Sequence, residues 1–174
     1  VRAFSIDDHT TTEIDDAFSV RDLPNGHYEV GIHIAVPALG IPRGSPLDAA
    51  ARARLSTVYM PGRKITMLPE PVIDAFTLAE GKTVPALSLY AEVGADGSVV
   101  RYATRLNRVP VAANLRLNDI GDVFTRDLPA HAGPPWNAEL RVLWKVVQKL
   151  AEARGKTDID RIDYSFYVDW DAAP

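Results

Sequence analysis

The chain has 174 residues, of which 47% are hydrophobic and 24% charged, and it carries a formal net charge of −4. This composition is ordinary for a soluble globular protein, and the length favours one domain. Because there is no cysteine, disulfides, zinc–thiolate sites and thiol nucleophiles are excluded, and a cytoplasmic location is expected. The acidic charge counts against a simple nucleic-acid-binding module, which usually neutralises phosphates with basic residues. No apolar run approaches the roughly 20 residues that span a bilayer, so no membrane partner is expected.

The order of the predicted elements favours an α+β fold. In chain order they are strands at residues 17–21 and 27–36, a loop at 37–46, a helix at 46–55, an irregular segment at 59–71, strands at 84–93 and 98–109, a helix at 115–125, a loop at 129–135, a helix at 137–154 and a strand at 164–170. The Asn25-Gly26 pair predicts a hairpin between the first two strands. Ser45 and Pro46 are typical of a helix N-cap and first residue. We therefore predict one domain over residues 1–174, with a largely antiparallel sheet and packed helices.

Five carboxylates cluster within residues 6–16: Asp7, Asp8, Glu13, Asp15 and Asp16. Such a cluster costs electrostatic repulsion unless a cation neutralises it or water screens it. Hard divalent cations such as Mg²⁺ prefer oxygen ligands, and a pair of them serves phosphodiester hydrolysis. A solvated acidic loop is the alternative, as is a calcium loop, although the glycine and flanking helices of an EF-hand are missing. Apolar residues bracket the acids on both sides, which a wholly solvated loop would not need. The residues alone leave metal binding and solvation open.

The acid cluster and several segments after it resemble, in the same order, the start of the catalytic domain of the ribonuclease II/ribonuclease R family. The similar segments are residues 4–7 (FSID), 13–20 (EIDDAFSV), 32–35 (IHIA), 44–48 (GSPLD), 57–62 (TVYMPG) and 67–69 (MLP). The resemblance covers about residues 4–90 and weakens after Asn114. It implies the fold of the N-terminal part of that catalytic domain, and so a chain that is a piece of a longer protein.

The resemblance implies a hydrolytic exoribonuclease that works from the 3′ end of single-stranded RNA and releases nucleoside 5′-monophosphates. In the family the aspartates hold Mg²⁺, and Mn²⁺ is a possible substitute. By position, Asp7, Asp15 and Asp16 match catalytic, metal-binding aspartates, and Glu13 stands at a fourth metal position where the family usually has aspartate. Asp8 matches no required position and is interpreted as a solvated neighbour.

Two further residues are candidates for RNA binding through the resemblance. Tyr59 matches an aromatic residue that packs on nucleotides near the 3′ end, and Arg63 is placed to contact phosphates. Stacking on aromatic rings is tolerant of sequence, which suits a nuclease that accepts any base. The alternatives are a tyrosine wedged into its own loop and a solvated arginine. We interpret His33, on the polar face of its strand, as structural.

Three departures from the family support other hypotheses. Glu13 replaces an aspartate, Val36 stands where the family commonly has aspartate, and no tyrosine stands near Leu117. The family's catalytic domain is also longer, and its second half supplies a catalytic arginine. We therefore expect the isolated chain to be weak or inactive and to need other domains of the full-length protein. The alternatives are a non-catalytic RNA-binding or interaction domain derived from the nuclease, and a structural calcium-binding domain.

Overall fold

The computed structural model describes residues 2–60, 63–125 and 135–156. These residues form two compact units. The first is built from Val1–Val36 and Ala75–Lys156, and the described part of the second is Pro37–Asp74. The single domain expected over residues 1–174 stays a prediction. No helix in the described ranges is long and apolar enough to cross a membrane.

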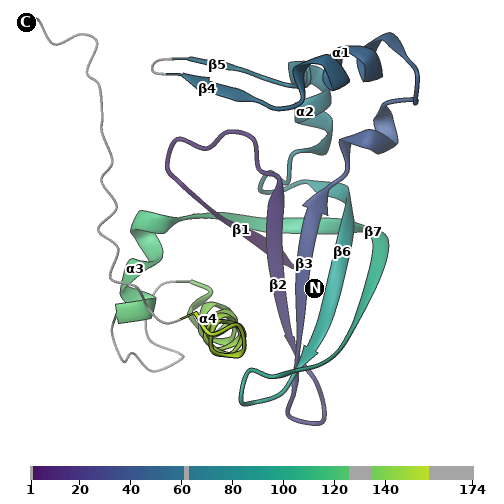
Figure 1. The fold of residues 1–174 in the computed structure, drawn as a ribbon. Coiled ribbons are helices and arrows are strands. Elements are labelled where there is room, and N and C mark those ends of the chain that lie inside the picture. Colours follow the sequence, from purple (N-terminus) through teal and green to yellow (C-terminus); the bar gives the residue numbers. More distant parts are fainter. Residues whose placement is uncertain (1, 61–62, 126–134, 157–174) are drawn as a thin grey trace, which may run out of the picture. The chain divides into compact units, whose positions relative to one another are not determined.

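The first unit is a closed five-stranded β-barrel (Figure 1). Its strands, in their order around the barrel, are β1 (Ala3–Asp7), β2 (Asp16–Asp22), β3 (Tyr28–Ala35), β6 (Thr83–Val93) and β7 (Val99–Arg116). Each neighbouring pair is antiparallel except β1 and β7, which run parallel and close the barrel. The predicted α+β class with a largely antiparallel sheet is confirmed.

The barrel closes because β7 changes its partner. As far as Pro110 it pairs with β6, and from Val111 to Arg116 it pairs with β1. This second pairing lengthens the strand beyond the predicted end at residue 109. It also delays the next helix, α3, which begins at Leu117 and not at residue 115. The hairpin of β2 and β3 turns at Gly26, whose φ of 77° is easily adopted by glycine.

Side-chain alternation divides the barrel's residues between its inside and its outside. Ala3 and Ala17 point inward with Val84, Val109 and other small apolar residues into one buried cluster. Phe4 points outward, where it is covered by α3 (Leu117–Thr125) and α4 (Asn137–Ala153). Its ring lies 4.8 Å from that of Trp136, between centroids. The two helices therefore pack on the outer face near the start of β1.

The second unit contains a short 3₁₀ helix, η1 (Pro37–Gly40), the helix α1 (Pro46–Arg54) and a two-stranded sheet of β4 (Val58–Met60) and β5 (Arg63–Ile65). The Ser45 hydroxyl accepts a hydrogen bond from the Asp48 amide, which confirms the predicted N-cap. The irregular segment predicted at 59–71 was wrong in part. It contains both short strands and the start of α2 (Glu70–Phe76), where Pro71 falls in the first turn and costs no helical hydrogen bond.

The remaining predicted helix, over residues 137–154, is confirmed as α4, and Gly155 after it has a φ of 63°, as a C-cap glycine should. Residues 129–134 of the predicted loop and the predicted strand at 164–170 lie outside the described residues.

Candidate functional site

The predicted acidic residues lie where β1 ends and β2 begins. Asp7 is the last residue of β1 and Asp16 is the first of β2, so both belong to strands and only residues 8–15, the acid loop, lie between them. Because the two strands are antiparallel neighbours, these two ends adjoin. Partial burial of the carboxyl, and then the negative charge of Asp7, raises the pKa of Asp16. The residue as a whole is exposed, so water screens part of the repulsion between the two carboxylates.

The other acids do not join this pair to form a closed cluster. Asp8 and Asp15 are exposed and Glu13 is half-buried. Within the described ranges, no three histidines, aspartates or glutamates gather closely enough to hold a metal ion. The structure thus brings together Asp7 and Asp16. The full metal site, with Glu13 and Asp15, stays a prediction.

Ile14 fixes the second half of the acid loop. Its side chain is buried in the apolar cluster inside the barrel. Its amide donates a hydrogen bond of 2.9 Å to Thr77 Oγ1, and its carbonyl accepts one of 2.9 Å from the Leu78 amide. The carbonyl of Asp15 accepts a further bond from the Ala35 amide. The apolar residue between the acids therefore anchors the loop, as the sequence pattern indicated.

Two polar residues hold the Asp7 carboxylate in place. The fully buried Ser5 donates from its hydroxyl to Asp7 Oδ2 over 2.5 Å. Ser5 Oγ in turn accepts a hydrogen bond of 2.9 Å from Asn114 Nδ2, and Asn114 Oδ1 accepts one from the Glu80 amide. Among the described residues, no donor bonds to the second oxygen of Asp7. The carboxylate is therefore oriented through one of its two oxygens.

Arg116 braces the first half of the acid loop. It is the last residue of β7 and lies opposite Asp7 in the parallel pairing with β1. Its Nη1 donates to the carbonyl oxygens of Asp8 (2.7 Å) and Thr11 (3.3 Å), and the Thr11 amide also donates to the Asp8 carbonyl. The arginine holds the turn of the loop and brings a positive charge to it.

Ser5, Asn114 and Arg116 were not among the site residues predicted from the sequence. Ser5 was detectable, since it lies two residues before Asp7 and so on the same face of a strand. Asn114 and Arg116 carried no local signal, because they reach the site only through the parallel pairing of two strands more than 100 residues apart.

Tyr59 and Arg63 lie in the second unit. Tyr59 is central in β4, opposite Lys64, and its residue surface is 74% exposed, so its ring is not wedged into its own loop. Arg63 begins β5 and is also exposed. Both side chains are accessible, and their contact with RNA stays a prediction.

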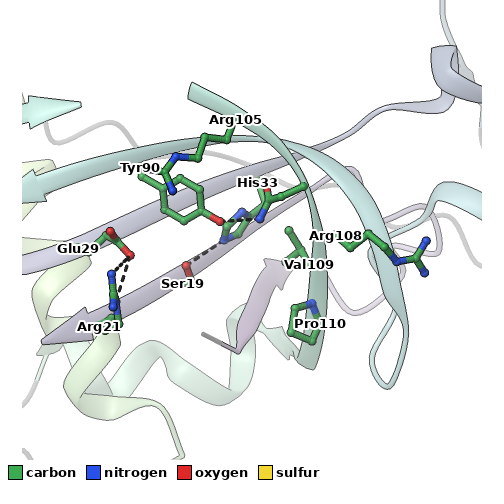
Figure 2. Close-up of a pocket in the computed structure, with 10 residues that line it drawn as sticks. Ser19, Arg21, Glu29, His33, Tyr90, Arg105, Arg108, Val109 and Pro110 are labelled. Atoms are coloured by element: carbon green, nitrogen blue, oxygen red, sulfur yellow. Dashed lines mark hydrogen bonds and ion pairs between the residues drawn. The ribbon is translucent and has the colours of Figure 1, made fainter. Parts of the chain in front are cut away.

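His33 is buried inside the barrel, as its structural interpretation requires. Its Nδ1 lies 2.7 Å from Ser88 Oγ and its Nε2 lies 2.9 Å from Ser19 Oγ. Figure 2 shows the bond to Ser19. Burial lowers the pKa of the imidazole to about 4, so the ring is neutral near pH 7. With both nitrogens bound to serines, His33 is not available as a metal ligand.

Known proteins resemble this chain over nearly all of its length. The RNB domain family matches residues 1–171. Exoribonuclease 2 of Aeromonas hydrophila is 32% identical over 177 residues, covering 94% of this chain and 25% of that protein. The structure of Mycoplasma genitalium RNase R in complex with ribose methylated single-stranded RNA superposes with a TM-score of 0.81 at 17% identity, covering 98% of this chain and 27% of that one. Yeast Ssd1, described as a pseudonuclease, superposes with a TM-score of 0.74 at 23% identity, covering 88% of this chain and 18% of that one.

The chain spans between 14 and 26% of the length of four curated relatives that it matches. The similarity therefore covers a limited part of each of these proteins.

Proposed function

The chain belongs to the RNB domain family, and from this membership we propose that it is part of a hydrolytic exoribonuclease. The enzyme degrades single-stranded RNA from its 3′ end in the cytoplasm and releases nucleoside 5′-monophosphates. The observation that carries the proposal is the pair Asp7 and Asp16 at adjoining strand ends, with Asp7 oriented by Ser5, within a chain matched by this family along its length. Other domains of the full-length protein complete the RNA channel.

The carboxylate oxygens at the two strand ends suit a hard divalent cation. Mg²⁺ in phosphoryl-transfer sites is usually held by one or two carboxylates, while water and substrate phosphates fill its other positions. Asp7 and Asp16 supply two such carboxylates, and their mutual repulsion would be relieved by a cation. Asp15 and Glu13, on either side of the anchored Ile14, are the nearest further ligands along the chain. Mn²⁺ takes the same ligand types. Bound there, the cation would neutralise phosphate charge and activate water for hydrolysis.

The chain's own residues orient the site and the substrate. Ser5 and Asn114 fix one oxygen of Asp7, and Ile14 and Arg116 fix the two halves of the acid loop. The exposed ring of Tyr59 stacks on one base near the 3′ end, a contact worth about 1–3 kcal/mol. Arg63 binds a backbone phosphate.

A metal titration tests the site directly. Mg²⁺ or Mn²⁺ should raise the melting temperature of the 174-residue chain, and Ca²⁺ alone should not reproduce the effect. Asp16→Asn should remove this metal-dependent increase, even though it relieves repulsion in the metal-free protein. Asp8→Asn is the matched control, since Asp8 is exposed in the same loop, and it should keep the increase. An equal response in all three proteins would contradict the assignment, and stabilisation by Ca²⁺ but not Mg²⁺ would favour a structural calcium site.

Activity is tested on the full-length protein with single-stranded RNA labelled at its 5′ end. We expect stepwise shortening and release of nucleoside 5′-monophosphates, both lost in the Asp15→Asn, Asp16→Asn double variant. The 174-residue chain alone should be weak or inactive, because it spans at most 26% of the four relatives compared, and the resemblance implies that a further part of the catalytic domain supplies an arginine that stabilises phosphate charge. Rapid degradation by the isolated chain would contradict this expectation.

A second candidate function is a non-catalytic RNA-binding domain derived from the nuclease. It is favoured by the absence of any three-acid group within the described ranges, and by Glu13 and Val36 at positions where the family has aspartate. This function predicts that full-length protein binds single-stranded RNA but releases no mononucleotide in Mg²⁺ or Mn²⁺.

A further inference from the structure

A polar pocket is lined by residues of β2, β3, β6 and β7, and none of its lining residues belongs to the acid loop. Its volume is about 300 Å³, and all of its lining residues belong to the first unit. We call it the arginine pocket and define it by Ser19, His33, Tyr90, Arg105, Asn107 and Arg108 (Figure 2). Its volume lies at the lower end of the range for small-molecule sites, so it suits a ligand of mononucleotide size. Its lining is mostly polar, so the ligand should be polar too.

The charged lining of the pocket favours an anion. Arg21 and Glu29 also line it, but they neutralise each other through an ion pair of 2.8 Å. Arg105 has no carboxylate partner among the described residues, and its guanidinium lies over the ring of Tyr90, 5.9 Å from the centroid. Arg108 donates to the carbonyl of Thr83, which leaves its charge uncompensated. Figure 2 shows its head group apart from Arg105. Arg105, which like Asn107 lies against Tyr90, is therefore the candidate anion contact.

The inner wall of the pocket offers a hydrogen-bond acceptor. Asn107 donates from Nδ2 to the Tyr90 hydroxyl over 2.8 Å. Its Oδ1 is buried and has no partner among the described residues. A buried carbonyl oxygen without a donor is unfavourable, so an N–H or O–H group of a ligand would be bound there. His33 and Ser19 already bond each other and add no charge at neutral pH.

We propose that the arginine pocket binds the phosphate monoester of a mononucleotide. Arg105 binds the phosphate, since a guanidinium matches phosphate oxygens in charge and geometry, and Asn107 Oδ1 accepts a hydrogen bond from the base or ribose. The choice of a mononucleotide over other phosphate esters rests on the proposed function, whose products are of this class. Along β2, Ser19 is three residues from Asp16, or about 10 Å at the rise of a strand, so the pocket is distinct from the acid pair.

The experiment is a calorimetric titration of the 174-residue chain in EDTA, so that no metal or RNA takes part. Adenosine 5′-monophosphate should bind saturably, and adenosine, which lacks the phosphate, at least about tenfold more weakly. Inorganic phosphate should compete with the mononucleotide. Arg105→Gln should weaken binding about tenfold or more, and Asn107→Asp should do the same by placing a negative charge beside the ligand.

Arg101→Gln is the matched control. Arg101 is an exposed arginine on the same strand, but it is paired with Glu92 at 2.6 Å and does not line the arginine pocket. The Arg101→Gln substitution should change the affinity for the mononucleotide by less than about twofold. Because Arg105 is exposed, its variant should fold normally, which a melting curve checks.

Three results would overturn the proposal: no saturable binding up to about 10 mM mononucleotide, equal affinity for adenosine, or equal losses in Arg105→Gln and Arg101→Gln. The last result would show general electrostatic attraction in place of a pocket. The outcome is separate from the proposed nuclease activity: an inactive protein can still bind the mononucleotide, and an active one can fail to bind it here.

Discussion

Replacing Thr77 by valine should loosen the acid loop without changing the shape of the core. Thr77 is buried, and its Oγ1 accepts the hydrogen bond from the Ile14 amide at 2.9 Å. Valine has nearly the same volume but no acceptor, so the buried Ile14 amide would lose its partner. Such an unsatisfied donor costs about 1–3 kcal/mol, partly offset by the added methyl group. The Leu78 amide still binds the Ile14 carbonyl, so the loop should stay attached at one point.

We expect Thr77→Val to lower the free energy of unfolding by about 1–2 kcal/mol. For a chain of this size that corresponds to a fall of about 2–8 °C in melting temperature. Urea unfolding measures the free energy of unfolding, and calorimetry measures the melting temperature. Thr77→Ser keeps the hydroxyl and should cost less, and Thr10→Val, at an exposed position of the same loop, should change stability by less than about 0.5 kcal/mol.

The loop should also bind metal less well in Thr77→Val, because Ile14 positions the acids on either side of it. Two results would contradict this anchoring role of the hydroxyl: a Thr77→Val variant as stable as the wild type, or a Thr77→Ser variant destabilised as much as Thr77→Val. Either result would mean that the hydroxyl does not anchor Ile14.

Three other substitutions test neighbouring features. Ser5→Ala should weaken Mg²⁺ binding about tenfold by freeing the Asp7 carboxylate, as measured by titration against Ser5→Thr. Gly31→Ala should cost about 1–3 kcal/mol in urea unfolding, since a Cβ there would clash with Ser19 Oγ and the His33 ring, whereas Gly121→Ala, in a helix with open space, should stabilise. The pKa of His33 is lowered from 6.5 to about 4, so between these pH values the unfolded chain binds a proton that the folded protein does not. The free energy of unfolding should therefore fall by about 3 kcal/mol as the pH is lowered from 6.5 to 4. His33→Gln should flatten that part of the stability–pH curve.

Local signals predicted the local structure well. Three predicted features were confirmed: the Asn25-Gly26 turn, the Ser45 N-cap and the helix α4 with its apolar spacing. Each of them depends on residues that are close together in the sequence. Ile14, an apolar residue among acids, correctly indicated an anchored loop. The paired strands β4 and β5 were missed because the prolines and glycine among residues 59–71 were taken as evidence of irregular structure.

Long-range structure could not be predicted from these signals. The parallel pairing of β1 with β7 depends on Ala3–Asp7 meeting residues 111–116, and neither segment carries a local mark of the other. For the same reason Asn114 and Arg116 were absent from the predicted site. The pairing of Asp7 with Asp16 was expected from their closeness in sequence, whereas the position of Glu13 and Asp15 relative to that pair depends on the loop's hydrogen bonds.

The parallel closure of β1 on β7 has a consequence for how the site forms during folding. Asp7 is oriented by Ser5, which is itself held by Asn114, and the first half of the acid loop is braced by Arg116. Asn114 and Arg116 both come from the last strand of the barrel. Contacts between residues more than 100 positions apart form late, because the entropy of closing such a long loop opposes them. A chain that has synthesised or folded only β1 to β6 would have the contacts of Ser5 and Thr77 but would lack those of Asn114 and Arg116. The acid pair should therefore reach its full order only in the last step of barrel closure.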